Sequence, residues 1–265
     1  MCINVYIFRN GIDSSIEKWN NLGISPVNGH LEIAKAVNRQ AMGVDADPVN
    51  LIKGILTMGL VDGYSGLHMA TDLQDILFGT PELVKAEYRL GVIKEDYVNI
   101  AVHGHMPIMA EKVVEWAEKV EEQAIQLGAK GINIVGICCT ANELLMRKGI
   151  SVATNYASQE LAIVTGALDV LITDVQCIMP GLKQAADCYH TELISTISYA
   201  KVEGASYVEF TSEKADEFAQ EIVRRALSRY KMRDSYETTD EPSIGAIQLK
   251  QQISFLKGLS KSGKL

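Results

Sequence analysis

The sequence predicts an α/β protein in which a partial helical domain precedes a domain built on a parallel β-sheet. Residues 14–81 space their apolar side chains by three and four, which is typical of amphipathic helices. From residue 97 onward, short apolar runs alternate with helical patterns. These runs are apolar on both faces, as strands of a parallel sheet covered by helices on both sides must be. We therefore expect the second domain to be Rossmann-like.

The helical segment contains three periodic stretches, IEKWNNLGI, HLEIAKAVNRQAMG and PVNLIKGILTMGLVDG, separated by Gly, Pro and Asp signals. The glycine-rich stretch that follows predicts a break, and then a last helix that ends near Gly79. We assign residues 1–90 to the partial helical domain.

The sheet domain is expected to span residues 91–233. Its predicted strands cover 97–105, 131–139, 150–156, 169–177 and 192–197, and its predicted helices cover 108–127, 141–148, 158–167 and 181–190. A long helix over 212–233 should begin with Ser212 as its N-cap. Residues 234–265 read as a linker and C-terminal tail, the start of a further domain.

Composition narrows the class of protein. A net charge of −8 argues against a nucleic-acid partner, since binding to a phosphate backbone relies on clustered Lys and Arg. No apolar run approaches the roughly 18 residues of a membrane span, and the first residues lack the features of a secretory signal. Five cysteines, an odd number, make a disulfide framework improbable. We expect a cytoplasmic protein with no membrane span.

Three predicted strands end in side chains that bind metals. His103 and His105 follow the first strand, Cys138 and Cys139 the second, and Cys177 the fourth. Because ligands of open parallel sheets lie beyond the carboxyl ends of the strands, these side chains can converge on one point. Imidazole and thiolate together suit iron, nickel, zinc or an iron–sulfur cluster, and do not suit magnesium or calcium.

The same residues also fit a plainer interpretation, because free cysteine is often buried as a small hydrophobic residue. Asn142 and Glu143 open the helix after Cys139, where they would complement its N-terminus or lie beside the ligands and support them.

Other chemistries are less well supported. The sequence has no GxGxxG, GxxxxGK[ST] or GxSxG motif, and a cysteine nucleophile paired with His105 would leave Cys177 without a role.

Longer motifs carry a family resemblance. HGHMP, LGAKGINIVGICCTANE, QELAIVTGALDVLITDVQCIMP and CYHTELIST, preceded by MGVDADPVNLI and GLHMATDLQDILFGTP, closely resemble the central part of the anaerobic nickel-iron carbon monoxide dehydrogenases. The resemblance runs from about Trp19 to about Tyr230. It implies a nickel-iron-sulfur cluster that oxidises CO with water to CO2, releasing two electrons and two protons.

The resemblance also implies roles for individual residues. His105 and Cys139 would bind the iron outside the cubane, and Cys177 would bind one iron of the cubane. His103, Cys138 and Asn142 would lie next to these ligands without binding metal themselves.

The sequence departs from the family in length and in cysteine content. Family members are more than twice as long and bring further cluster cysteines from regions on both sides, whereas here the remaining cysteines are only Cys2 and Cys188. We therefore expect a truncated module whose cluster is absent or incomplete. It would be inactive alone and dependent on a homodimer partner, on missing domains or on another subunit. A metal-free scaffold domain and a relative of the hybrid-cluster reductases are the alternatives.

Overall fold

The computed structural model describes residues 13–233, so Cys2 and the expected linker and tail over 234–265 lie outside the described residues. The chain forms two compact units, Met1–Pro81 and Glu82–Leu265. The sequence placed this boundary near residue 90. In the structure, Arg89 N donates to Val152 O and Val152 N donates to Glu87 O. These bonds attach residues 87–89 to the sheet unit, and each unit is described here by itself.

The helices of the first unit begin where the sequence signals predict. They are α2 (Asp13–Leu22), α3 (Gly29–Met42) and α4 (Pro48–Val61). The side chain of Asn28 accepts a hydrogen bond from Leu31 N and caps α3, and Asp47 caps α4 through Val49 N and Asn50 N. Pro48 occupies the first helical position of α4, where its missing N–H costs nothing.

The predicted break after α4 is wrong. Residues Asp62–His68 form a π-helix that continues without interruption into α5 (Met69–Phe78). The end of α5 is confirmed, since its C-cap is Gly79 with φ of 82°. Among the residues of this unit that the structure describes, most large apolar side chains are exposed, among them Val37, Ile55 and Ile76, whereas Ile16, Ile24 and Val61 are buried.

The second unit is built on a six-stranded sheet, and all of its pairings are parallel. The strands are β1 (Val98–His103), β2 (Ile132–Ile137), β3 (Val152–Thr154), β4 (Val170–Thr173), β5 (Glu192–Ser195) and β6 (Ser206–Tyr207). Their order, β3-β2-β1-β4-β5-β6, is the doubly wound Rossmann order, which confirms the predicted fold class. Strand order reverses between β1 and β4, where a ligand is expected.

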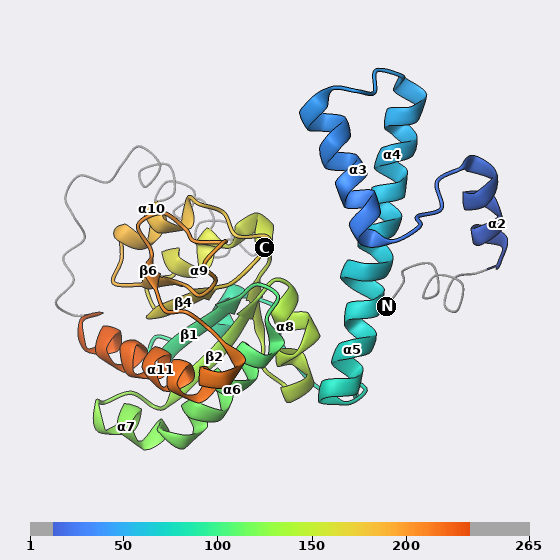
Figure 1. The fold of residues 1–265 in the computed structure, drawn as a ribbon. Helices are drawn as coiled ribbons and strands as arrows, with labels where there is room; N and C mark the ends of the chain where they lie inside the picture. The colour runs from blue at the N-terminus through green and yellow to red at the C-terminus, as the bar shows by residue number, and fades with distance from the viewer. Residues whose placement is uncertain (1–12, 234–265) are drawn as a thin grey trace, which may run out of the picture. The chain divides into compact units, whose positions relative to one another are not determined.

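Helices cover both faces of this sheet (Figure 1). On one face α6 (Pro107–Lys119) packs beside α11 (Ala215–Lys231), and α7 (Glu121–Gln126) follows α6. On the other face lie α9 (Glu160–Val164) and α10 (Leu182–Asp187). The short α8 (Cys139–Glu143) directly follows β2. The 3₁₀ turns are Leu90–Val92, Leu145–Lys148, Tyr156–Ser158 and Ser212–Lys214.

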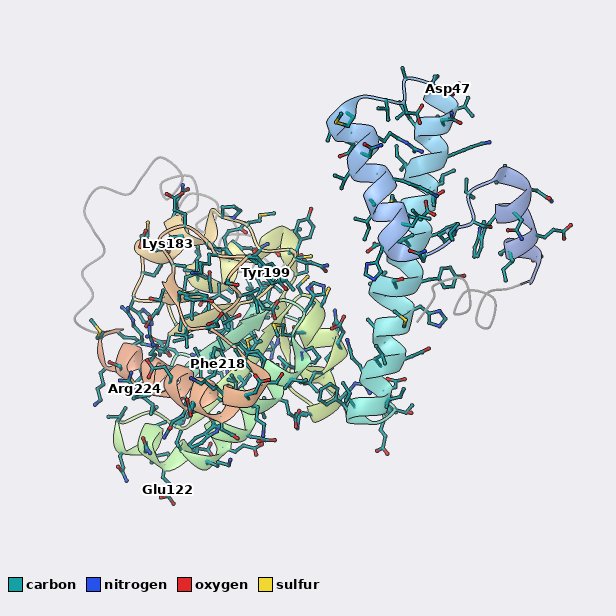
Figure 2. All side chains as sticks on the ribbon, viewed as in Figure 1. Asp47, Glu122, Lys183, Tyr199, Phe218 and Arg224 are labelled. Atoms are coloured by element: carbon teal, nitrogen blue, oxygen red, sulfur yellow. The ribbon has the colours of Figure 1, made fainter. Side chains whose placement is uncertain are left out.

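One sequence expectation about α11 is wrong. Ser212 is not the N-cap of the long helix, because it lies in the 3₁₀ turn that precedes α11, and Lys214 holds the cap position without a side-chain bond. On α11, Phe218 is buried and packs edge-to-face against Phe210, while Arg224 on the outer side is exposed (Figure 2). Buried and exposed side chains thus lie on different sides of α11, and the buried side packs against the core.

A buried polar network closes the amino ends of β1 and β4. Asp169 is fully buried, and its carboxylate accepts hydrogen bonds from Arg233 Nε at 2.8 Å and from Asn99 N at 2.7 Å. His190 Nε2 lies 3.1 Å from the same carboxylate. Arg233 also donates to the carbonyls of Tyr97 and Ala167. In the part of the chain that the structure describes, no helix has both the length and the apolar character to cross a bilayer.

Candidate metal centre

The two histidines after β1 have different environments. His103 is the last residue of β1 and is fully buried, and its Nε2 lies 2.9 Å from Gln159 Oε1. Burial lowers the pKa of His103, so the ring stays neutral. His105 is half-buried, and its Nδ1 lies 3.1 Å from the carbonyl oxygen of Val175. Because a carbonyl can only accept, this contact places the ring proton on Nδ1 and leaves the Nε2 lone pair free for a metal.

Asp174 joins the loop after β1 to the loop after β4. Its carboxylate accepts hydrogen bonds from His105 N at 2.6 Å, from Met106 N at 2.8 Å and from Val175 N. Burial raises the pKa of Asp174, and the three backbone N–H groups oppose that rise. The carboxylate fits only because residue 104 is glycine. Asp174 thus holds the backbone of His105 in place.

Gln159 fixes the loop that carries Cys177. Its Nε2 donates to the carbonyls of Tyr156 at 2.6 Å and Cys177 at 3.0 Å. Its Oε1 accepts from Met179 N at 3.1 Å and from His103 Nε2. Gln159 is fully buried, and its amide oxygen and nitrogen both make hydrogen bonds. The amide therefore links the end of β1 to the loop after β4.

A close approach of backbone positions α8 beside this loop. A Cβ built on Gly136 of β2 would lie 2.8 Å from Ala141 Cα, far inside normal contact. Glycine at this position therefore allows α8 to pack directly on β2. Thr140 N also donates to Gly104 O at 2.8 Å, which ties the first turn of α8 to the loop that carries His105.

Strained backbone conformations occur in the loop after β2, which carries Cys138, and in the loop after β4, which carries Cys177. Among the described residues, the non-glycine residues with positive φ are Cys138 (65°), Gln176 (61°) and Cys177 (54°). Such conformations cost on the order of 1–3 kcal/mol each and persist where the surroundings enforce them. Both loops are therefore held in shape by their contacts, which is typical of a functional site.

Three thiols lie close together at the carboxyl end of the sheet. Cys138 Sγ is 3.8 Å from Cys139 Sγ, and the thiol of Cys177 is near enough to influence the pKa of Cys139. Burial, followed by the nearby Cys138, Glu143 and Cys177, raises the pKa of Cys139 to about 12. A cation bound here would reverse this effect, because it favours the thiolate.

The structure also adds a residue to the candidate metal centre. Ligand atoms of His105, Cys139 and Glu143 all lie within 4.8 Å of one another, and the three side chains are half-buried. The sequence predicted a helix-end or supporting role for Glu143, and its proximity to His105 was not foreseen. Asn142, expected beside the ligands, is exposed on α8, and Cys177 is also exposed.

The residues that hold the ligand loops in place were missed by sequence reasoning. Asp174 could have been noticed, since it is an acidic residue directly after a buried strand. Gln159 gives no such signal. The donor set of imidazole and thiols fits iron, nickel, zinc and iron–sulfur clusters.

Comparison with known proteins identifies the family. Residues 8–255 match the Prismane/CO dehydrogenase family. The chain is 49% identical over 220 residues to carbon monoxide dehydrogenase 1 of Carboxydothermus hydrogenoformans, covering 83% of this chain and 34% of that protein. It is 47% identical over 217 residues to the carbon monoxide dehydrogenase/acetyl-CoA synthase subunit beta of Moorella thermoacetica, covering 82% and 32%.

A solved structure agrees with these relatives. Carbon monoxide dehydrogenase IV from Carboxydothermus hydrogenoformans superimposes with a TM-score of 0.80 at 55% identity, covering 85% of this chain and 36% of that one. The chain thus spans about a third of the length of each of these relatives. On the strength of this match and of the shared fold, the chain belongs to the Prismane/CO dehydrogenase family.

Proposed function

We propose that this chain is a module of a nickel-iron carbon monoxide dehydrogenase. His105, Cys139 and Cys177 would be its contribution to a nickel-iron-sulfur cluster that converts CO and water to CO2, two electrons and two protons. The observation that supports this most strongly is the gathering of an imidazole and thiols from three strand ends beside the β1–β4 switch point. The names of the relatives supply the substrate, CO.

The chain's own residues prepare the ligands. Val175 O accepts a hydrogen bond from His105 Nδ1, which leaves Nε2 as the atom that would bind the metal. Asp174 and Gln159 hold the backbones of His105 and Cys177. When bound, such a cluster supplies Lewis acidity and the capacity to accept two electrons. Cys138, at hydrogen-bond distance from Cys139, would adjust the charge around the ligands.

Three side chains do not complete the coordination of such a cluster. We propose that the other ligands come from outside these 265 residues, from a homodimer partner, from further domains or from another subunit, and that the chain alone oxidises CO slowly or not at all. The free thiols of the described residues fit a reducing, cytoplasmic setting. No observation favours a metal-free scaffold or a hybrid-cluster reductase.

The test is the metal content of anaerobically purified chain. Iron, nickel, zinc and acid-labile sulfide would be measured in the wild type, in Cys139→Ser and in Cys188→Ser. Cys188 is a matched control, because it is also a half-buried free cysteine but lies at the end of α10. We expect iron and sulfide that are lost in Cys139→Ser and kept in Cys188→Ser. Equal metal in both variants would contradict the proposed ligands, and metal-free wild type would mean that no part of the cluster forms without the other ligands.

CO-dependent reduction of a viologen dye tests the second part of the proposal. We expect no useful rate for the chain alone. A rate like that of a complete dehydrogenase would show that no other ligand source is needed.

A further inference from the structure

We propose that Glu143 is a metal ligand that acts with His105 and Cys139, and that these three side chains bind a single divalent ion, Fe²⁺ or Zn²⁺, without ligands from elsewhere. This inference rests on the proposed function, because it takes His105 and Cys139 as metal ligands. It goes beyond it by adding a carboxylate and by giving the isolated chain a metal site of its own.

The positions of the three side chains suit one ion. Cys139 and Glu143 are the first and last residues of α8 and are four positions apart, which puts them on the same face of the helix. His105 reaches the same place from the loop after β1, and the three ligand atoms lie within 4.8 Å of one another. Ligands bound to zinc at about 2.0–2.3 Å are separated by roughly 3.5 Å, so a small closing of the side chains completes the site.

The backbone fixes this arrangement. The hydrogen bond from Thr140 N to Gly104 O joins the neighbours of Cys139 and His105. The contact of Gly136 with Ala141 holds α8 on β2. At the far end of α8, Arg147 Nε donates to Glu143 O at 2.6 Å. The three ligands thus come from elements already fixed to one another, which reduces the entropy lost on binding.

The donor chemistry selects the ion. A thiolate and a carboxylate together balance the charge of a divalent cation, and a neutral imidazole completes three ligands. Such a mixed set suits Zn²⁺ or Fe²⁺, whereas Mg²⁺ and Ca²⁺ prefer oxygen ligands throughout. All three side chains are half-buried, so the ion can enter and a fourth position stays open to water.

The test uses Co²⁺ as a spectroscopic probe that takes the place of Zn²⁺ or Fe²⁺. The reduced, metal-free 265-residue chain would be titrated anaerobically, and cobalt–thiolate charge-transfer absorption would be followed. We expect one Co²⁺ per chain, with binding abolished in His105→Ala and Cys139→Ser and weakened at least tenfold in Glu143→Gln. Glu160→Gln, at the first residue of α9, and Cys188→Ser are the matched controls and should bind as the wild type does.

A second variant at the same position separates loss of a ligand from a change in folding, because its signal should increase. In Glu143→Cys a second thiolate would join the ion, so the charge-transfer absorption per bound Co²⁺ should increase. An unchanged intensity with unchanged affinity would overturn the role of Glu143. Thermal unfolding of each metal-free variant would confirm that it is folded.

The outcomes separate the two proposals. If His105→Ala and Cys139→Ser lose Co²⁺ but Glu143→Gln binds it as tightly as wild type, the inference about Glu143 is wrong and the proposed ligands stand. If Co²⁺ survives in Cys139→Ser, or binds only through Cys138 and Cys177, the three-residue site is wrong and the cluster ligands come into question as well. No stoichiometric binding by the wild type would overturn the site outright.

Discussion

The carboxylate of Asp174 occupies the space that a side chain at residue 104 would need. A Cβ built on Gly104 would overlap the Asp174 carboxyl group, and Gly104 has φ of +143°, a conformation that few other residues adopt. The glycine between the two histidines therefore admits a buried carboxylate, which in turn binds the N–H groups of His105 and Met106. Two loops far apart in sequence depend on this one contact.

Replacing Asp174 by Asn should loosen both loops. An amide has one oxygen where the carboxylate has two, and its NH2 group would face backbone donors. We expect a loss of about 2–3 kcal/mol in the free energy of unfolding, measured with urea. Hydrogen exchange should quicken at the amides of His105, Met106 and Val175.

Asp169→Asn is the matched control for that experiment, because Asp169 is also a buried carboxylate and lies at the other end of β4. It should destabilise the protein while exchange quickens near Asn99 and not near His105. Equal exchange at His105 in wild type and Asp174→Asn would show that Asp174 does not hold this loop.

Gly136→Ala should displace α8 from β2. The new methyl group would meet Ala141, whose Cα is 2.8 Å from the added Cβ, in a helix pinned at both ends. We expect a destabilisation of about 1–3 kcal/mol in urea unfolding, as for other overpacked cores.

Gly181→Ala serves as the comparison for Gly136→Ala. Gly181 precedes α10 with φ of −60°, and a Cβ there would have no atom within 4 Å. Its replacement should be neutral or slightly stabilising, since alanine restricts the unfolded chain. If the two glycine variants unfold at the same urea concentration, close packing of α8 on β2 is not what requires Gly136.

Gln159→Ala should lower the free energy of unfolding more than an ordinary surface substitution does. It removes the partner of His103 Nε2 and of Met179 N and frees the carbonyl of Cys177. Leaving such buried groups unpaired costs about 2–4 kcal/mol in total. Gln184→Ala, on the exposed side of α10, should change the urea midpoint little. Similar midpoints for the two variants would count against Gln159 as the link between the loops.

The strands and the edge that carries the candidate centre could be predicted because they depend on local pattern. Apolar runs marked five strands, and the carboxyl ends of parallel strands lie at one edge, so His105, Cys139 and Cys177 could be grouped before their distances were known. Strand β6 was missed because two residues carry no periodicity. The π-helix was missed because its glycines read as a break.

The supporting residues depend on contacts that sequence does not encode locally. Asp174 meets His105 across 69 positions, and Gln159 meets His103 across 56. Glu143 illustrates a different limit. Its spacing from Cys139 was visible, but an acidic residue near a helix N-terminus has an ordinary electrostatic explanation. Glu143 becomes a ligand candidate only because His105, on the loop after β1, lies close to it.

Glu192 should make stability depend on pH. It is buried at the start of β5, and its carboxylate accepts from Arg225 Nη1 at 2.6 Å and Arg229 Nε at 3.1 Å, which attaches α11 to the sheet. Burial raises the pKa of Glu192, but hydrogen bonds from Ser206, Arg225 and Arg229 outweigh burial and hold it below its ordinary value of 4.5. A lowered pKa in the folded state stabilises the protein above pH 4.5, and this stabilisation is lost as pH falls through the folded-state pKa.

Glu192→Gln should therefore be less stable than wild type at pH 7. We expect a loss of about 2 kcal/mol in the free energy of unfolding, which is less than for a fully buried pair because both arginines are partly exposed. The difference in the free energy of unfolding should shrink as pH falls below 4.5, since the wild-type carboxyl group then takes up a proton. Urea unfolding of both proteins between pH 7 and pH 3 measures this. A difference that stays constant over that range would mean that Glu192 contributes through packing and not through its charge.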